Sequence, residues 1–214
     1  MVDLIITKSD WDKALSERHS QDVQKSFSSA TVAICGLGGL GSNIAISLTR
    51  AGIGKLILID FDRVDITNLH RQQYKACQIG RYKTEALSEN LREITPYIEL
   101  KRHTVRITEE NIAELLQDAD IICEAFDDAE AKAMLTNIVL ETMADKYLVA
   151  ASGMAGMGST NTIQTRKVSN HFYLCGDGAS DVAEEGSLVA TRVMLCAAHQ
   201  AHTVLRILTK QFEI

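Results

Sequence analysis

The 214-residue sequence lacks long apolar runs and clusters of basic residues. No apolar stretch approaches the ~20 residues that a helix needs to span a membrane, and the first ten residues lack the features of a signal peptide. A net charge of −6 without a Lys- and Arg-rich run argues against a nucleic-acid-binding surface. We therefore expect a cytoplasmic protein that binds neither membranes nor nucleic acids.

The sequence also lacks paired cysteines. Its five cysteines, an odd number, stand far apart at positions 35, 77, 123, 175 and 196, and no two of them form a Cys-x-x-Cys motif. Neither a disulfide framework nor a structural zinc site is indicated. We expect reduced thiols, with Cys35 and Cys123 as small core residues on predicted strands.

Apolar runs and helical patterns alternate through most of the sequence, which is typical of an α/β protein. The predicted fold is Rossmann-like, with a mostly parallel sheet, helices on both faces and an antiparallel C-terminal edge. Parallel strands are predicted over residues 31–35, 55–60, 98–103, 120–126 and 147–151, the antiparallel edge over 161–167 and 171–174, and a long closing helix over 186–208.

The chain divides into two predicted parts of unequal size. Residues 1–28 form a helical extension, in which apolar residues such as Trp11, Leu15 and Phe27 recur at near-helical spacing. Residues 29–214 form the main domain. Near its end, the segment 152–185 is rich in glycine, which is consistent either with a mobile crossover above a site or with ordinary turns.

A glycine-rich turn with Gly36, Gly38, Gly39 and Gly41 follows the first predicted strand and opens a helix. This context favours phosphate binding, because the glycines permit a close backbone approach and a helix N-terminus attracts anions. Asp60 ends the second strand about 20 residues later, where an acidic side chain binds ribose hydroxyls in such folds. Up to this point, an NAD-dependent oxidoreductase and an ATP enzyme explain the sequence equally well.

Polar residues that follow the second strand favour ATP. A triphosphate that releases pyrophosphate needs cations at its β and γ groups. Arg71 offers a planar guanidinium that can donate two parallel hydrogen bonds, and Lys83 offers an ammonium on a flexible side chain. Asp127 and Asp128 follow the fourth strand, at the edge of the sheet where ligands bind. A carboxylate there either caps the next helix or binds Mg²⁺, and the nearby cations favour the metal.

Several ordered motifs resemble those of the ThiF, MoeB and HesA family, which is related to the ubiquitin-activating enzymes. Within this family, the chain is most similar to the short form of the thiamine-biosynthesis branch, ThiF. The motifs are the glycine turn at 36–41, Ala51-Gly52-Ile53-Gly54, Asp60-Phe61-Asp62, Asn68-Leu69-His70-Arg71-Gln72 and Lys83, with weaker similarity as far as the last helix.

The resemblance implies a ubiquitin-activating-enzyme-like fold and an ATP-binding adenylyltransferase domain at 29–214. The implied reaction is ATP-dependent adenylation of the C-terminal Gly-Gly carboxylate of a ThiS-like sulfur-carrier protein, with release of pyrophosphate, in thiamine thiazole synthesis. A homodimer and a sulfur-donor protein are the other implied partners. The implied nucleotide-binding residues are Gly36, Gly38, Gly39, Gly41, Asp60, Asp62, Asn68, Arg71, Gln72 and Lys83, with Arg71, Lys83 and Asp127 as catalytic residues and Asp127 as the Mg²⁺ ligand.

Three departures from the family pattern matter. Many members carry two Cys-x-x-Cys pairs that bind zinc, whereas only Cys175 stands at such a position here, so no zinc is predicted. Cys175 is either a covalent acceptor of the activated carrier or a plain loop cysteine. Of two N-terminal arginines only Arg18 is present, with Gln21 at the second position, which leaves open whether an arginine of a partner subunit reaches ATP. Asp128 replaces the usual asparagine.

Three functions remain open at this stage. Carrier adenylation rests on the joint presence of Arg71, Gln72, Lys83 and Asp127. An NAD-dependent oxidoreductase rests on the glycine turn and Asp60 alone, and a noncatalytic carrier-binding scaffold would keep the fold without turnover. A dehydratase that acts on a modified tRNA base is a further alternative within the family, to which the acidic net charge lends little support.

Overall fold

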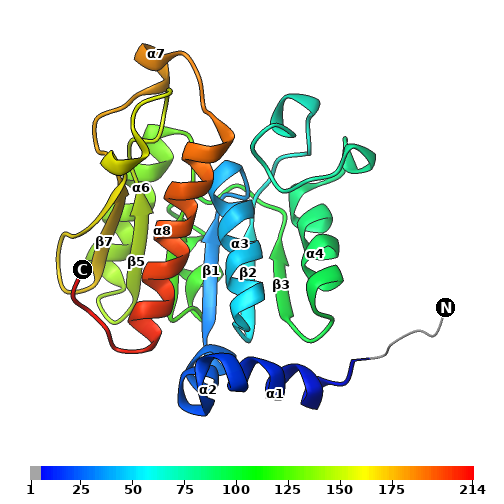
Figure 1. The fold of residues 1–214 in the computed structure, drawn as a ribbon. Coiled ribbons are helices and arrows are strands. Elements are labelled where there is room, and N and C mark those ends of the chain that lie inside the picture. The colour runs from blue at the N-terminus through cyan, green and yellow to red at the C-terminus, as the bar shows by residue number, and fades with distance from the viewer. Residues whose placement is uncertain (1–5) are drawn as a thin grey trace.

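The computed structural model describes residues 6–214 and shows a seven-stranded sheet in the order β3-β2-β1-β4-β5-β7-β6 (Figure 1). All neighbouring strands are parallel except β6 and β7, which pair antiparallel at one edge. The strands are β1 (Thr31–Cys35), β2 (Lys55–Ile59), β3 (Glu99–His103), β4 (Ile121–Glu124), β5 (Tyr147–Ala151), β6 (Gln164–Lys167) and β7 (Phe172–Gly176).

Alternate residues of the central strands face two separate hydrophobic cores. On β1, Val32 and Ile34 belong to the core beneath α3, α4 and α8, while Ala33 and Cys35 belong to the core beneath α5 and α6. Because both faces are covered, these strands are mostly apolar, with Thr31, Lys55 and Glu124 at their ends. The helices are α1 (Lys8–His19), α2 (Gln21–Ser29), α3 (Gly39–Ala51), α4 (Lys83–Ile94), α5 (Ile112–Leu116), α6 (Ala129–Thr142), α7 (Val182–Glu185) and α8 (Ala190–Leu208), with 3-10 helices η1 (Ile66–Asn68), η2 (Ala76–Gln78) and η3 (Thr160–Thr162).

The Rossmann-like prediction is confirmed, including helices on both faces and the antiparallel edge. The predicted start of the closing helix was wrong, because Gly186 has a φ of 72° and ends the short helix α7 instead. The long helix α8 begins at Ala190. Within residues 6–214, no helix combines the length and the apolar character that crossing a membrane requires.

The predicted N-terminal extension contains two helices. Ser20 separates them with a φ of 79°, and its hydroxyl caps α2. Helix α1 has no buried residue, whereas Phe27 of α2 packs into the core. Residues 1–5 of the predicted extension lie outside the described residues, and the domain boundary at residue 28 stays a prediction.

The carboxyl ends of the parallel strands all point to the same side of the molecule, which is the top in Figure 1. Helices α1 and α2 lie at the amino ends of the strands, below the sheet in Figure 1. Arg18 is exposed and belongs to α1, which lies at the amino ends of the strands, opposite the loops that follow β1, β2 and β4 (Figure 1). Those loops carry the residues predicted to bind the nucleotide.

Candidate functional site

The glycine turn between β1 and α3 is closed by backbone contacts. Gly36 has a φ of 91°, and its amide donates a 2.9 Å hydrogen bond to the carbonyl of Ile59. A Cβ at Gly41 would lie 1.9 Å from the carbonyl oxygen of Gly36, so only glycine allows α3 to pass this close to the turn. A Cβ at Gly38 would meet only Gln72, at 3.7 Å. The turn therefore leaves space at the N-terminus of α3, which is the arrangement that binds phosphate.

Asp60 follows β2 and holds the glycine turn from the side. Its Oδ2 accepts a 2.6 Å hydrogen bond from the Leu37 amide, and its Oδ1 accepts a 2.7 Å bond from the Asp62 amide. Burial raises the pKa of Asp60, an effect that the Lys83 ammonium and the two amides oppose. Each carboxylate oxygen has a second lone pair, so Asp60 can shape the turn and still accept a ligand hydroxyl.

Arg71 and Gln72 bring unused polar atoms to the site. Arg71 Nε and Gln72 Oε1 are buried, and neither has a hydrogen-bond partner in the described part of the chain. The Arg71 side chain lies beside the turn, where a Cβ on Gly39 would be 3.5 Å from Arg71 Cγ. Because buried polar atoms in proteins are nearly always paired, these two favour a polar ligand at this position.

Lys83, the first residue of α4, is the second predicted cation. Its Nζ donates a 2.8 Å hydrogen bond to Asp62 Oδ2 in an ion pair. The Lys83 amide also donates to the Asp62 carbonyl, at 2.9 Å, which joins the start of α4 to the loop after β2. The ammonium is therefore held beside Asp62, close enough to Asp60 to lower the pKa of its carboxyl.

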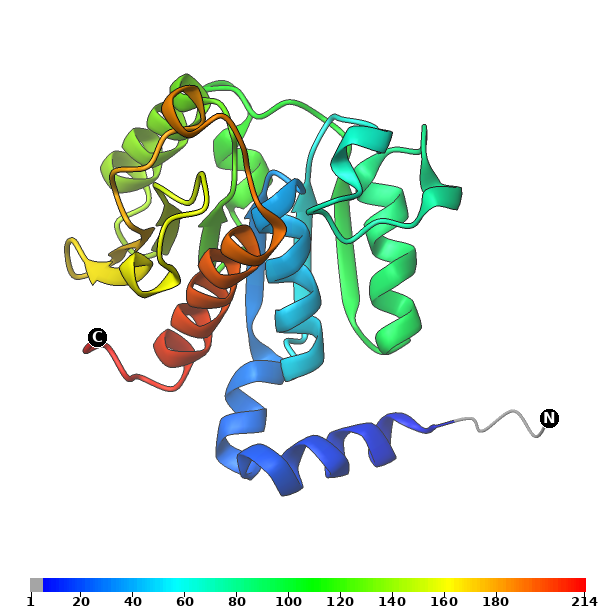
Figure 2. The same cartoon turned by 45° about the horizontal axis from the view of Figure 1, so that its top comes forward.

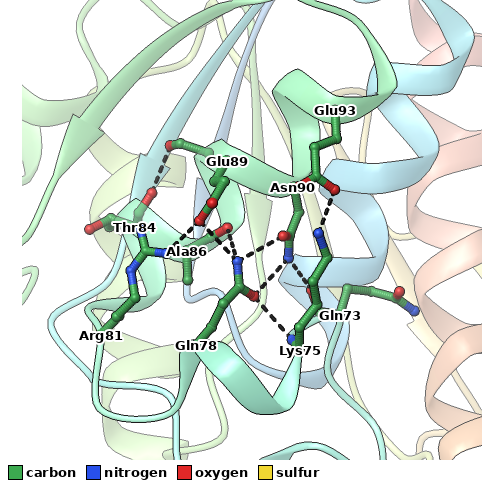
Figure 3. Close-up of polar contacts among 10 residues, drawn as sticks. Gln73, Lys75, Gln78, Arg81, Thr84, Ala86, Glu89, Asn90 and Glu93 are labelled. Atoms are coloured by element: carbon green, nitrogen blue, oxygen red, sulfur yellow. Dashed lines mark hydrogen bonds and ion pairs between the residues drawn. The ribbon is translucent and has the colours of Figure 1, made fainter. Parts of the chain in front are cut away.

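The loop that follows Arg71 is attached to α4 by buried amides that the sequence analysis did not identify (Figure 3). Gln78 Nε2 donates a 2.8 Å hydrogen bond to Asn90 Oδ1, and Asn90 Nδ2 donates a 2.8 Å bond to the Gln73 carbonyl. Both amide side chains are buried. The burial of Asn90 could have been predicted from its position, because it lies three residues after Leu87 and therefore on the same, buried face of α4.

The two aspartates after β4 have different environments. Asp128 is the N-cap of α6 and accepts a 2.7 Å hydrogen bond from the Ala131 amide. Asp127 is exposed at the cavity, and no group of residues 6–214 donates a hydrogen bond to its carboxylate. Asp128 therefore caps α6, and of the two aspartates only Asp127 stays a candidate metal ligand.

A free carboxylate beside a phosphate site suits Mg²⁺, which is usually held by one or two carboxylates together with phosphates and water. Residues 6–214 contain no group of three or more His, Cys, Asp or Glu side chains able to hold a metal. An ion at Asp127 would therefore take most of its ligands from a nucleotide.

A buried ion pair next to Asp127 was not predicted. Glu124, the last residue of β4, accepts hydrogen bonds on both carboxylate oxygens from Lys132 Nζ, each at 2.8 Å. Its Oε1 also accepts a 2.7 Å bond from the Phe126 amide. Burial raises the pKa of Glu124, and Lys132 opposes this effect. Through the Phe126 amide, Glu124 shapes the turn that carries Asp127.

One cavity of about 510 Å³ brings these segments together. Gly41 and Asn68 do not line it, because Gly41 lies behind the turn and Asn68 Oδ1 accepts a 3.3 Å bond from the Asp65 amide. A second cavity, of about 430 Å³ near His199, contains none of the predicted residues. The predicted residues that line the first cavity are Gly36, Gly38, Gly39, Asp60, Asp62, Arg71, Gln72, Lys83 and Asp127.

Cys175 lies on β7, so its expected position in a loop was wrong. It is buried, and its sulfur contacts the hydroxyls of Thr165 and Thr203. Burial raises the pKa of the thiol to about 11. A buried, protonated thiol is a poor nucleophile, which favours a structural role over a covalent bond to a carrier.

Curated proteins similar to the chain include several named adenylyltransferase and sulfurtransferase. UBA4 of Lodderomyces elongisporus is 26% identical over 196 residues, which cover 89% of this chain and 43% of that protein. MOCS3 of Aedes aegypti is 33% identical over 126 residues, which cover 58% of this chain and 28% of that protein. The chain thus spans less than half the length of these relatives.

Solved structures share the fold over most of this chain. TcdA of E. coli, a tRNA N6-threonylcarbamoyladenosine dehydratase in complex with ATP, has a TM-score of 0.84 and 22% identity, covering 97% of this chain and 98% of its own. MccB of E. coli with ATP has a TM-score of 0.71 and 22% identity, covering 90% and 59%. The family model described as ThiF family matches residues 12–214. The chain therefore belongs to the ThiF family.

Proposed function

We propose that this chain is an ATP-dependent adenylyltransferase, which activates a carboxylate by transferring AMP to it. The observation that carries the proposal is the convergence of separate segments on one cavity: the glycine turn, Asp60, Arg71, Lys83 and Asp127. The unpartnered, buried Nε–H of Arg71 is a donor and suits a polyanionic ligand. The names of both curated relatives, which include adenylyltransferase, support the same activity.

In the proposed complex, the glycine turn and the N-terminus of α3 bind phosphate, and Asp60 binds the ribose. Arg71, Gln72 and Lys83 bind the triphosphate, with Asp62 holding Lys83 in place. Gly41 and Asn68 act indirectly, since they shape the turn and the loop without lining the cavity.

The proposed reaction needs no general base. The terminal carboxylate of a protein has a reference pKa of about 3.5 and is ionised at neutral pH. One of its oxygens attacks the α-phosphorus, a new P–O bond forms, and pyrophosphate leaves with the electron pair of the bond that breaks. The main requirement is charge neutralisation, which Arg71 and Lys83 provide for the leaving group. When bound at Asp127, Mg²⁺ supplies further neutralisation of the phosphate oxygens.

For the acceptor, we propose the C-terminal Gly-Gly carboxylate of a ThiS-like sulfur carrier in the thiazole branch of thiamine synthesis, with a sulfur-donor protein as a later partner. The motif resemblance and the sulfurtransferase names of the relatives support this. We also propose a homodimer in the cytoplasm, where ATP is supplied. Arg18 belongs to α1, at the amino ends of the strands, whereas the cavity lies among the loops at their carboxyl ends, so we propose that any contact of Arg18 with ATP is made in the partner subunit.

A modified tRNA nucleoside is a second candidate acceptor. One observation favours it: TcdA, named a tRNA N6-threonylcarbamoyladenosine dehydratase, is matched over 98% of its length. The net charge of −6 counts against tRNA binding, because phosphate backbones are bound by Lys and Arg. The proposed experiment therefore includes both acceptors.

The first experiment compares thermal stabilisation of the protein by Mg-ATP and by NAD, followed by ATP–pyrophosphate exchange with a ThiS-like carrier or with tRNA. A ligand at 100 times its Kd stabilises the native state by about 2.7 kcal/mol. We expect stabilisation by Mg-ATP and exchange that depends on the carrier. Stabilisation by NAD alone would overturn the proposal, and ATP binding without exchange would favour a noncatalytic scaffold. Exchange that depends on tRNA would replace the carrier with the second acceptor.

A further inference from the structure

The segment between β5 and α8, residues 152–189, forms the wall of the cavity that faces the glycine turn. Its orange part, including α7, lies above the carboxyl ends of the strands in Figure 1 and passes toward the start of α8 in Figure 2. The phosphate-binding groups proposed above belong to the other wall. The lining residues of the segment are Ser152, Gly153, Met154, Ala155, Ser180, Asp181, Val182 and Leu188.

Arg192, in the first turn of α8, joins two distant stretches of this segment. Its Nη2 forms an ion pair with Asp177 Oδ2, and its Nη1 donates a 3.1 Å hydrogen bond to the Ser159 carbonyl. The side chains of Arg192 and Asp177 are only 4% and 11% exposed. A guanidinium covered to this extent is not a surface group with an incidental partner.

Asp177 continues the connection to the cavity. Its Oδ1 accepts hydrogen bonds from the amides of Ala179, at 2.9 Å, and Ser180, at 2.8 Å. Ser180 Oγ in turn accepts a 3.0 Å bond from the Ala155 amide. Burial alone would raise the pKa of Asp177, but these amides and Arg192 lower it below its ordinary value. An unbroken series of polar contacts therefore runs from Arg192 to two residues that line the cavity.

Glycines of the segment are required by these contacts. A Cβ on Gly153 would lie 2.0 Å from Asp177 Oδ1, and one on Gly158 would lie 2.7 Å from Arg192 Nη1. The glycine content that was consistent with a mobile crossover instead allows the chain to pack closely around the ion pair. This favours the alternative of ordinary turns held in fixed positions.

We infer that Arg192 is a positioning residue, which acts through Asp177 to hold residues 152–155 and 180–182 in place as the wall along which the acceptor tail enters. This rests on the proposed function. A Gly-Gly tail has no side chains for a pocket to recognise, so its alignment depends on the position of the backbone around it. Arg192 does not itself line the cavity. Its loss should therefore affect acceptor binding and leave the nucleotide wall unchanged.

The test compares Arg192→Met and Arg192→Lys with the wild-type protein, and with Arg206→Met as a matched control. Arg206 lies on the last turn of α8, hydrogen-bonds Gln211 at 3.3 Å and does not line the site cavity. Amide hydrogen exchange is measured for peptides that cover residues 152–160 and 176–186. The affinity for ATP and the KM of a ThiS-like carrier in pyrophosphate exchange are measured separately.

In Arg192→Met, we expect amide hydrogen exchange in both peptides to accelerate about tenfold or more, because local opening becomes easier. The hydrogen exchange of peptides from β1, α3 and α4 should stay as in the wild-type protein. The carrier KM should rise about tenfold with the ATP affinity retained, and Arg192→Lys should recover part of the loss. Amide hydrogen exchange that is unchanged in Arg192→Met, or that is accelerated equally across the chain, would overturn the inference. So would an ATP affinity that falls as much as the carrier affinity.

Two further measurements make the test conclusive. If Arg192→Met does not fold, Asp177→Asn is used instead. The side-chain oxygen of the new asparagine still accepts hydrogen bonds from the amides of Ala179 and Ser180, but the negative charge that pairs with Arg192 is lost. If the wild-type protein shows no carrier-dependent pyrophosphate exchange, the proposed function fails. Hydrogen exchange then still decides whether Arg192 holds the wall.

Discussion

Two ion pairs border the cavity, and they are built in opposite ways. In Lys83–Asp62 the cation is covered and the anion is half exposed, at 7% and 49%. In Lys132–Glu124 the anion is covered and the cation is more exposed, at 1% and 25%. The phosphate of a ligand can replace a carboxylate that faces the cavity, but nothing can replace one inside the core. The first pair can therefore give up Asp62 for a ligand phosphate, whereas the second keeps Glu124 in the core to support the turn before Asp127, with Lys132 also lining the cavity.

The largest effect is expected from Lys83→Ala. It should slow pyrophosphate exchange by about 10²–10³-fold, the cost of removing one group that stabilises developing charge. The free energy of unfolding should fall by about 1–2 kcal/mol, because Asp62 remains hydrated while the covered methylenes of Lys83 lose their packing. Exchange kinetics and urea unfolding measure the two quantities. Lys75→Ala, which removes a lysine that pairs with Glu93 outside the cavity, serves as the control. Unchanged exchange in Lys83→Ala would refute the assignment.

Lys132→Met should have its main effect on stability. It leaves the carboxylate of Glu124 buried without its cation, which typically costs about 3 kcal/mol. Urea unfolding measures this loss. The double variant Lys132→Met/Glu124→Gln removes both charges and should regain most of the stability. A single variant as stable as the wild-type protein would show that the pair contributes nothing.

The stability difference between Lys132→Met and the wild-type protein should depend on pH. Burial raises the pKa of Glu124 above its ordinary value of 4.5, so the folded state holds a proton that the unfolded state has lost, and stability falls as pH rises through this interval. Without the opposing effect of Lys132, the interval extends to higher pH. The difference should therefore be small at acidic pH and grow toward neutral pH. Urea midpoints between about pH 5 and pH 8 test this.

In a matched series with Glu124→Gln, the additional pH dependence should disappear, since no carboxyl remains to titrate. A difference between Lys132→Met and the wild-type protein that stays constant across this range would place its cause in packing and not in the charge of Glu124.

The smallest effect is expected from Asp62→Asn. It should change the free energy of unfolding by less than about 1 kcal/mol, because the carboxylate is half exposed. Calorimetric titration should show an ATP affinity that is retained or modestly increased, because Lys83 becomes free to bind phosphate. If the affinity falls as far as in Lys83→Ala, Asp62 is itself a ligand of the nucleotide.

The two pairs also differ in how far they could be predicted from the sequence. Asp62 and Lys83 belong to contiguous motifs next to a strand end, where chemistry and chain position coincide. Glu124 ends a strand whose other residues are apolar, and its burial depends on the helix that brings Lys132 back over it. Charged residues are mostly exposed in proteins, so a buried partner eight positions away leaves no pattern in the sequence.

The Rossmann-like fold was predictable because apolar runs and helical periods alternate, and the start of α8 was missed because Gly186 ends a separate short helix. Arg192 and Asp177 lie 15 positions apart, and their contact exists only once the segment before α8 has folded. The sequence did indicate the glycines around them, but not whether their role was motion or close packing.

The first turn of α8 has one more consequence. Arg192 holds the segment wall, while its neighbour Val193 packs against the glycine turn, where a Cβ on Gly39 would lie 2.9 Å from Val193 Cγ1. Two adjacent residues of one rigid helix thus touch both walls of the cavity. If nucleotide binds one wall and an acceptor the other, as proposed, we expect α8 to couple the two binding events in the wild-type protein and the coupling to weaken in Arg192→Met, where ATP affinity measured alone is retained. Such coupling is reciprocal, so each ligand would change the affinity for the other by the same factor.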